Sequence, residues 1–216
     1  MYEFVSKKEV QSARNEIEGV IHNVQDYLRK NNILTFQYNL VGSASKHRHL
    51  VTRIVGGNQG FDMDYNIIIQ SIDDKYNNPK RTKIILMQTF NEFLPKDFKP
   101  CEDSSSVFTI KKVNKQSKKI VYSFDFAIVH YYYPETEDEY YQVERQEYIS
   151  FNKKANSYSW ELRKIASDHR YMEQYIKHNS LWNRLREDYL KHKNSEPTKK
   201  SRIVYYETLK RIYNKY

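Results

Sequence analysis

Cysteine and long apolar runs are both scarce in this sequence. Cys101 is the only cysteine, so the chain can form no internal disulfide, and a zinc site built from cysteines is excluded. No segment approaches the roughly 20 consecutive apolar residues that span a bilayer. The N-terminal stretch also lacks the apolar run of a signal peptide. We therefore expect a cytoplasmic protein with no membrane partner.

Glycine and proline are also few, with 5 copies of each, whereas there are 20 tyrosines and 10 phenylalanines. Much of the core is therefore expected to be aromatic, with tyrosine hydroxyls reaching outward. Charged residues make up 29% of the 216-residue chain and hydrophobic residues 39%. This balance is typical of a folded chain that forms one large domain or two small ones, and it lies far from the disordered regime.

Lys and Arg outnumber Asp and Glu by 36 to 27, which gives a formal net charge of +9. A basic surface favours polyanionic partners such as nucleic acids or nucleotide phosphates. The alternative is that these side chains only solubilise the surface, because the lysines are scattered along the sequence rather than clustered.

Apolar periodicity predicts a mixture of helices and strands. Ser6 and Glu9 fit a capping box at the start of a helix that ends at Asn31–Asn32. The patterns further predict a strand through Phe36, Tyr38 and Leu40, a strand over 61–70, a loop over 73–79, a helix over 82–94, a hairpin of strands 107–113 and 120–132, and a strand over 147–151.

From about Tyr158 the apolar spacing becomes helical and predicts three helices, the first through Trp160 and Ile165. The fold class expected is therefore α+β: a mixed sheet with flanking helices and a helical C-terminal portion. We divide the chain into a core over 1–155, which includes the N-terminal helix, and a helical C-terminal subdomain over 156–216.

Three aspartates interrupt the apolar strands. Asp62 and Asp64 are two residues apart in a strand, so they share one face. Asp125 lies between Phe124 and Phe126, where an unpaired carboxylate would be costly. If the two strands are neighbours, the three carboxylates converge, and a hard cation such as Mg²⁺ or Mn²⁺ would offset their repulsion. The alternatives are an exposed edge strand for the first two and a buried cationic partner for Asp125.

The pair Gly42-Ser43 follows the strand that precedes these aspartates. Glycine allows the backbone to approach a phosphate closely, and N–H groups with the Ser43 hydroxyl can hold a triphosphate. An ordinary turn is the alternative reading of this pair alone.

Together these residues resemble the DNA polymerase beta-type nucleotidyltransferase superfamily. The resemblance rests on Gly42-Ser43, on Asp62-Met63-Asp64 and on Phe124-Asp125-Phe126, and it covers roughly residues 36–130. The gap between Ser43 and Asp62 is long. In this spacing the sequence resembles the branch that contains cyclic GMP-AMP synthase and the oligoadenylate synthases.

The resemblance implies a metal-dependent enzyme that transfers a nucleoside monophosphate from an NTP to a hydroxyl and releases pyrophosphate. It implies that Asp62 and Asp64 bind the catalytic Mg²⁺ or Mn²⁺ ions and that Asp125 binds the ion that activates the acceptor. Gly42 and Ser43 would contact the nucleotide phosphates, and the helical region after 155 would help to shape the cleft.

The acceptor stays open at this stage: an RNA end, a second nucleotide or a small molecule all fit. Synthesis of a cyclic or linear oligonucleotide, as a bacterial defence signal, is one alternative. A module that binds nucleic acid without catalysis on the same fold is another, although it would need none of the three aspartates.

Overall fold

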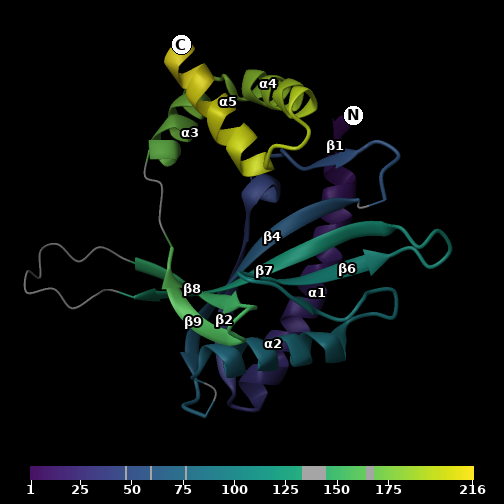
Figure 1. Cartoon of the computed structure of the whole chain (residues 1–216), viewed down its shortest axis with the longest axis vertical. Helices are drawn as coiled ribbons and strands as arrows, with labels where there is room; N and C mark the ends of the chain where they lie inside the picture. Colours follow the sequence, from purple (N-terminus) through teal and green to yellow (C-terminus); the bar gives the residue numbers. More distant parts are fainter. Residues whose placement is uncertain (47, 59, 76, 133–144, 164–167) are drawn as a thin grey trace, which may run out of the picture. The chain divides into compact units, whose positions relative to one another are not determined.

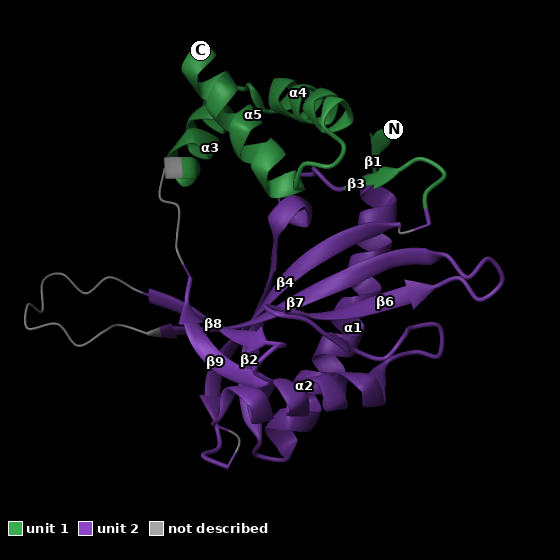
Figure 2. Ribbon diagram, in the orientation of Figure 1, with its two compact units in different colours: residues 1–5, 52–57, 164–216 green, residues 6–51, 58–163 purple. Residues whose placement is uncertain are grey.

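A computed structural model of the chain describes residues 1–46, 48–58, 60–75, 77–132, 145–163 and 168–216 (Figure 1). The chain forms two compact units, which we call the sheet unit (6–51 and 58–163) and the helical unit (1–5, 52–57 and 164–216) (Figure 2). The observed architecture is the α+β class predicted from the sequence.

The sheet unit holds one seven-stranded mixed sheet with two helices. Its elements are α1 (Lys7–Lys30), β2 (Leu34–Val41), the short 3-10 helix η1 (Gly42–Ala44), β4 (Phe61–Ile72), α2 (Pro79–Phe93), β5 (Glu102–Asp103), β6 (Phe108–Val113), β7 (Ile120–Tyr132), β8 (Arg145–Asn152) and β9 (Ser157–Leu162). The strand order is β2-β4-β7-β6-β5; β8 pairs with β7, and β9 pairs with β8. Only the β4–β7 pair is parallel among these described pairings.

Helix α1 begins at the capping box that the sequence predicts. The Ser6 hydroxyl accepts from the Glu9 backbone N–H, and the Glu9 carboxylate accepts in turn from the Ser6 N–H. The helix ends at Lys30 and is capped by Asn31, and Asn32 has a φ of 52°. Its apolar stripe is buried, as predicted, at Ala13, Ile17, Val20, Ile21, Val24 and Leu28.

The face of the sheet that packs on the helices is lined by aromatic rings. Phe90 of α2 lies 5.0 Å from Phe126 and 5.4 Å from Phe108, centroid to centroid. The Tyr122 hydroxyl hydrogen-bonds to Glu16 of α1 on the same side. The low glycine and high aromatic content therefore corresponds to an aromatic core, as the composition predicts.

The helical unit combines two short strands with three helices. Its elements are β1 (Tyr2–Phe4), β3 (Thr52–Ile54), α3 (Asp168–His178), α4 (Trp182–Ser195) and α5 (Ser201–Lys215). The strands β1 and β3 pair antiparallel. Asn194 ties β1 to α4: its Oδ1 accepts from the Tyr2 N–H at 2.6 Å and its Nδ2 donates to the Tyr2 carbonyl at 3.1 Å.

The positive charge of the chain is concentrated in the helical unit. This unit contains 14 of the 36 Lys and Arg residues but 7 of the 27 Asp and Glu residues, so it carries +7 of the net +9. The net charge of the sheet unit is therefore close to zero, although lysines look scattered along the whole sequence.

One sequence prediction is wrong at the start of the helical part. The first of the three helices was expected to run through Trp160, whereas 157–162 form strand β9, which pairs with β8. The aromatic residues Tyr158 and Trp160 alternate with polar ones, and this period of two is the strand signal. Ile165, the other residue of that predicted helix, lies outside the described residues. The helix observed in its place, α3, begins at 168.

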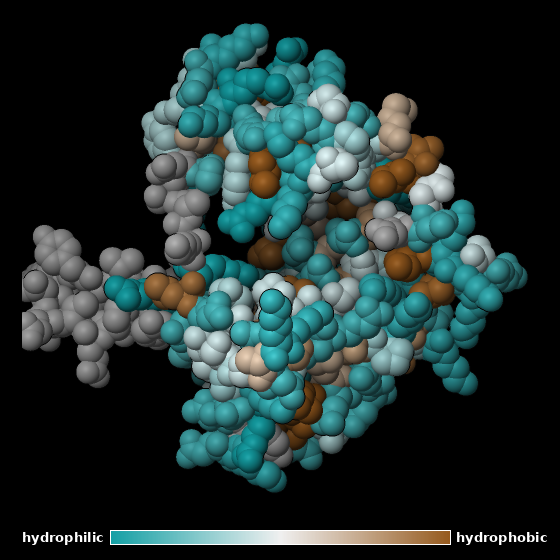
Figure 3. Space-filling model, in the orientation of Figure 1, coloured by the Kyte–Doolittle hydropathy of each residue, from teal (hydrophilic) through white to brown (hydrophobic). Residues whose placement is uncertain are grey.

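In the part of the chain that the structure describes, no helix combines the length and apolar character needed to cross a bilayer. Hydrophilic side chains predominate on the face drawn in Figure 3, where hydrophobic ones form small, separate spots.

Candidate functional site

The parallel pairing of β4 with β7 brings the three aspartates to one region of the sheet. Asp64 lies directly opposite Asp125 in the register, and Asp62 lies opposite Ser123. Because side chains alternate along a strand, Asp62, Asp64 and Asp125 all project from the same face. The two strands are therefore neighbours, which is the condition under which the sequence predicts that the three carboxylates converge.

That face is the one turned away from α1 and α2. Met63 and Tyr65 alternate with the aspartates and are fully buried, as are Phe124 and Phe126 on β7. Phe126 lies 5.0 Å from Phe90 of α2 and stacks on Tyr65, so the carboxylates point to the opposite side of the sheet. Along β4, Asp62 is exposed and Asp64 half-buried, which leaves them accessible to a ligand.

Gly42 closes one side of the carboxylate group. The last residue of β2, Val41, pairs with Asp64, so the next residue of the chain lies beside the Asp64 side chain. Gly42 has a φ of 65°, and a Cβ at this position would overlap Asp64 Oδ2 and lie 3.1 Å from Asp64 Cγ. Glycine is therefore required both by the backbone conformation and by the space that the carboxylate occupies.

Ser43 follows in η1, where hydrogen bonds fix the turn. The Ser43 carbonyl accepts from the Leu50 N–H at 3.0 Å, and the Gly42 carbonyl accepts from Arg48 Nη1 at 3.3 Å. The turn and Asp64 are adjacent, so the structure brings Gly42 and Ser43 to the same end of the sheet as the aspartates.

Burial and mutual repulsion raise the pKa values of two carboxyls. The pKa of Asp64 is raised to about 6, first by burial and then by the charges of Asp125 and Asp62. Burial also raises the pKa of Asp125, while a hydrogen bond from Thr109 and the charge of Lys111 act in the opposite direction. A bound divalent cation would offset both effects by stabilising the ionised carboxylates.

Two hydroxyls that the sequence analysis missed hold these carboxylates in place. Ser123 Oγ donates to Asp62, and Thr109 Oγ1 donates to Asp125 Oδ1 at 2.5 Å. Ser123 is two residues before Asp125, so the strand period could have indicated it. Thr109 lies opposite Asp125 across the β6–β7 hairpin, and only the hairpin register identifies it.

The donor set fits a hard divalent cation, since it consists of carboxylate oxygens with a neighbouring glycine turn. Among the described residues of the sheet unit, no three ligand atoms of His, Cys, Asp or Glu lie within 4.8 Å of one another. A cation with ligand distances of about 2.0–2.1 Å would therefore draw the carboxylates together by side-chain rotation.

A group of polar side chains lies farther along the same face of the sheet, beyond the aspartates. Arg163 Nη1 donates to Asn66 Oδ1 at 3.3 Å and to Gln146 Oε1 at 3.1 Å. Asn66 is two residues after Asp64 and shares its face, so a guanidinium lies along the row that begins with the carboxylates.

Comparisons with solved structures identify the fold. The chain aligns with a Rhodothermus marinus CdnE c-UMP-AMP synthase solved with Apcpp and Upnpp at a TM-score of 0.53 and 9% identity, over 96% of this chain and 71% of that one. It aligns with Escherichia coli DncV in a 3'-deoxy GTP bound form at a TM-score of 0.52 and 11% identity, over 84% of this chain and 60% of that one.

Vibrio cholerae DncV, a cyclic AMP-GMP synthase solved with a linear intermediate, gives a TM-score of 0.50 at 11% identity and covers 84% of this chain. The chain spans 59% of the length of that structure and so corresponds to only part of it. No protein-family model matches the sequence. No curated protein matches it either. At these identities the likeness shows the fold, which is that of the nucleotidyltransferases that the sequence motifs resemble.

Proposed function

We propose that the protein is a metal-dependent nucleotidyltransferase, which transfers a nucleoside monophosphate from an NTP to a hydroxyl and releases pyrophosphate. The observation that carries this proposal is the register of Asp64 opposite Asp125, with Gly42 in contact distance of Asp64. Three carboxylates beside a glycine turn form a site with both parts that the reaction needs: oxygen ligands for a cation and a backbone turn for phosphates.

In this proposal Asp62, Asp64 and Asp125 hold Mg²⁺ or Mn²⁺. A cation bound there would neutralise charge at the phosphates and lower the pKa of a hydroxyl that it coordinates. Ser123 and Thr109 keep the Asp62 and Asp125 carboxylates oriented toward the site through the hydroxyl hydrogen bonds described above.

The glycine turn has the second role. Backbone N–H groups around Gly42 and the Ser43 hydroxyl contact the nucleotide phosphates, and the absence of a Cβ at Gly42 lets the turn lie against Asp64. Catalysis then rests mainly on positioning and on stabilising negative charge, as is general for phosphoryl transfer.

A nucleotide as the hydroxyl acceptor is the version of this function that the comparisons favour. Two of the aligned structures are named as synthases of cyclic dinucleotides, c-UMP-AMP in one case and cyclic AMP-GMP in the other. Synthesis of a cyclic or linear oligonucleotide by this chain, acting as a bacterial defence signal in the cytoplasm, therefore ranks ahead of an RNA end or a small molecule as acceptor.

The test is pyrophosphate release from each of the four NTPs, singly and in pairs, with Mg²⁺ or Mn²⁺ and with or without RNA. We expect turnover for the wild type and a loss of roughly 10²–10³-fold or more for Asp64→Asn, with the fold retained. Asp26→Asn, which changes an exposed carboxylate of α1, is the matched control and should keep full activity.

Full activity in Asp64→Asn would refute the proposal. So would the absence of pyrophosphate release with every NTP, and RNA binding without metal would then favour the non-catalytic nucleic-acid-binding module instead.

A further inference from the structure

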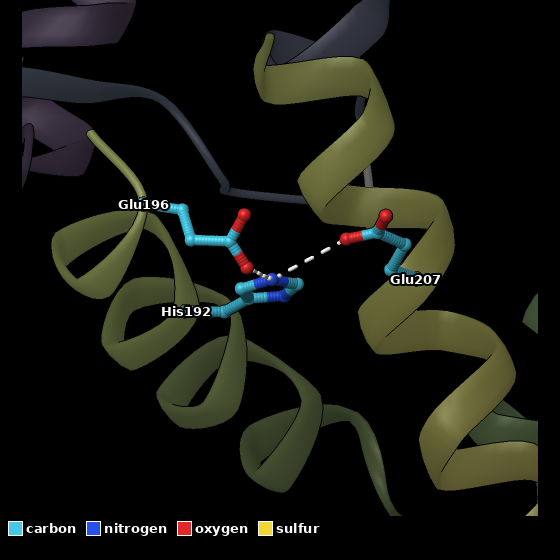
Figure 4. A group of neighbouring side chains, drawn as sticks. All are labelled: His192, Glu196 and Glu207. Carbon is cyan, nitrogen blue, oxygen red and sulfur yellow. Dashed lines mark hydrogen bonds and ion pairs between the residues drawn. The ribbon is translucent and has the colours of Figure 1, made fainter. Parts of the chain in front are cut away.

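A second group of ligating side chains lies in the helical unit and has no part in the proposed transfer. His192 and Glu196 come from the last turn of α4 and the residue that caps it, and Glu207 comes from α5 (Figure 4). One ligand atom of each lies within 4.8 Å of the others. His192 Nε2 is 3.0 Å from Glu196 Oε1 and 3.3 Å from Glu207 Oε2.

Both ring nitrogens of His192 have polar neighbours. Nδ1 lies 3.2 Å from Thr208 Oγ1, which is itself 2.8 Å from the Val204 carbonyl. Nε2 faces the two carboxylates. With its hydrogen on Nδ1, a neutral histidine presents the Nε2 lone pair to this position, so all three atoms can ligate one metal ion.

The surroundings match those of a metal-binding histidine. Such a histidine usually donates its other ring N–H to a fixed oxygen, and Thr208 Oγ1 lies 3.2 Å from Nδ1. The His192 side chain is 11% exposed, so its orientation is set by packing. Thr208 is fully buried.

Lys199 supports the carboxylates from the outer side. Its Nζ lies 2.7 Å from Glu196 Oε2, the oxygen that does not face His192. It also lies 3.1 Å from Glu207 Oε1 and 2.9 Å from Glu207 Oε2. Glu196 Oε1 is thus left to the histidine side, while Glu207 Oε2 is shared between the lysine and the ligand position.

The distances between the ligand atoms are close to those between two ligands of one tetrahedral Zn²⁺ ion. Two ligands about 2.0–2.1 Å from Zn²⁺ at a tetrahedral angle are about 3.3 Å apart. The two separations from Nε2, 3.0 Å and 3.3 Å, lie near this value. One imidazole with two carboxylates suits Zn²⁺ rather than Mg²⁺, which prefers oxygen ligands alone.

We propose that His192, Glu196 and Glu207 form a zinc site that joins α4 to α5, with a fourth position open to water. The ion would clamp the two helices across the turn over 196–200 and so stabilise the helical unit. The proposal is independent of nucleotidyl transfer, because none of its residues belongs to the carboxylate site of the sheet.

The test is calorimetric titration of the full chain with Zn²⁺ in excess Mg²⁺, which occupies oxygen-only sites. We expect one Zn²⁺ per chain and a zinc-dependent rise in the unfolding temperature. His192→Gln should weaken binding by about 100-fold or more, and Thr208→Val, which keeps the ligands, by roughly 10–100-fold. Co²⁺ in place of Zn²⁺ should give the visible absorption of a tetrahedral site.

The matched control is His178→Gln, which changes an exposed histidine in the last turn of α3 and should bind Zn²⁺ like the wild type. Equal Zn²⁺ affinity of the wild type and His192→Gln would overturn the proposal. An unfolding temperature that does not respond to Zn²⁺ would also overturn it, and the cluster would then be an ion-pair network around Lys199.

Discussion

Two glycines show how differently the same residue serves in this chain. Gly42 has a positive φ and lies against Asp64, whereas Gly19 is in α1 and a Cβ there would meet nothing within 4 Å. We expect Gly42→Ala to cost about 1–2 kcal/mol or more in the free energy of unfolding. It should also lower turnover by about 100-fold, because it displaces the Asp64 carboxylate. Chemical denaturation and pyrophosphate release measure the two effects.

Gly19→Ala is the matched control for this substitution. Alanine in an exposed helix interior should raise the free energy of unfolding by about 0.5–1 kcal/mol and leave turnover unchanged. If Gly42→Ala were equally harmless, the turn would not be held against the carboxylate as described.

The raised pKa of Asp64 predicts a pH dependence of stability in metal-free buffer. The native state holds this proton up to about pH 6, while the unfolded state releases it near 3.8. Between these values the native state binds more protons, so Asp64 makes the protein less stable as the pH rises. Asp64→Asn mimics the neutral carboxyl, and its stability relative to the wild type should grow across this window by on the order of 1–3 kcal/mol.

Denaturation of both proteins with a chelator present, from about pH 4 to pH 7, measures this difference. A difference that stays constant with pH, or that shrinks as the pH rises, would contradict the assigned environment of Asp64.

The sequence predicts the aspartates but not what supports them. Asp62, Asp64 and Asp125 stand out because a charge in an apolar strand is costly without a purpose. Their convergence depends on a parallel pairing between distant strands, and local periodicity carries no information on which strands pair. Thr109 and Ser123 are ordinary strand residues until the register is known.

At the scale of elements, local signals predicted best where one face of an element is buried and the other exposed. Helix α1 and the β6–β7 hairpin match their predicted positions because their apolar period is uninterrupted. The strand β9 was mistaken for helix, since two aromatic residues at a period of two are a short signal beside a long helical region. Its partner β8, predicted as a strand, could have indicated a hairpin there.

A buried ion pair links three of these elements. Lys83 of α2 is 1% exposed; its Nζ lies 2.6 Å from Asp103 Oδ1 and donates to the Ser104 carbonyl at 2.7 Å. Asp103 of β5 also accepts from the Tyr158 hydroxyl of β9 at 2.6 Å. Lys83→Met should lower the free energy of unfolding by roughly 3–5 kcal/mol, since it leaves the Asp103 carboxylate without its cation.

The double variant Lys83→Met with Asp103→Asn serves as the control, because it removes both charges. Urea denaturation should show that it recovers part of the loss. A double variant less stable than the single one would mean that Lys83 contributes through packing and not through its charge.

At the scale of the whole molecule, the charge is divided unequally between the two units. The helical unit carries +7 of the net +9, while the proposed catalytic carboxylates lie in the sheet unit. Any binding of RNA should therefore depend on the helical unit and on salt. Charge reversal at three exposed lysines of that unit, Lys200, Lys210 and Lys215, should weaken binding and reduce the slope of log K against log salt by up to about one per lost phosphate contact.

The control reverses three exposed lysines in the hairpin turn of the sheet unit, Lys115, Lys118 and Lys119. Fluorescence anisotropy with a labelled single-stranded RNA at several salt concentrations compares the two. Equal losses of RNA affinity in the two triple variants would contradict a role for the unequal charge division. General attraction of RNA to a basic protein would then be sufficient to explain the binding.

Crystallography can show whether the three aspartates and the glycine turn hold a divalent cation together with a triphosphate. Crystals grown with Mn²⁺ and a non-hydrolysable NTP analogue would locate the ion by its anomalous scattering. We expect an Mn²⁺ peak coordinated by Asp62 and Asp64, with the phosphates against Gly42 and Ser43 and with Asp125 on the same face. An ion and a nucleotide bound elsewhere, with these carboxylates left uncoordinated, would contradict this expectation.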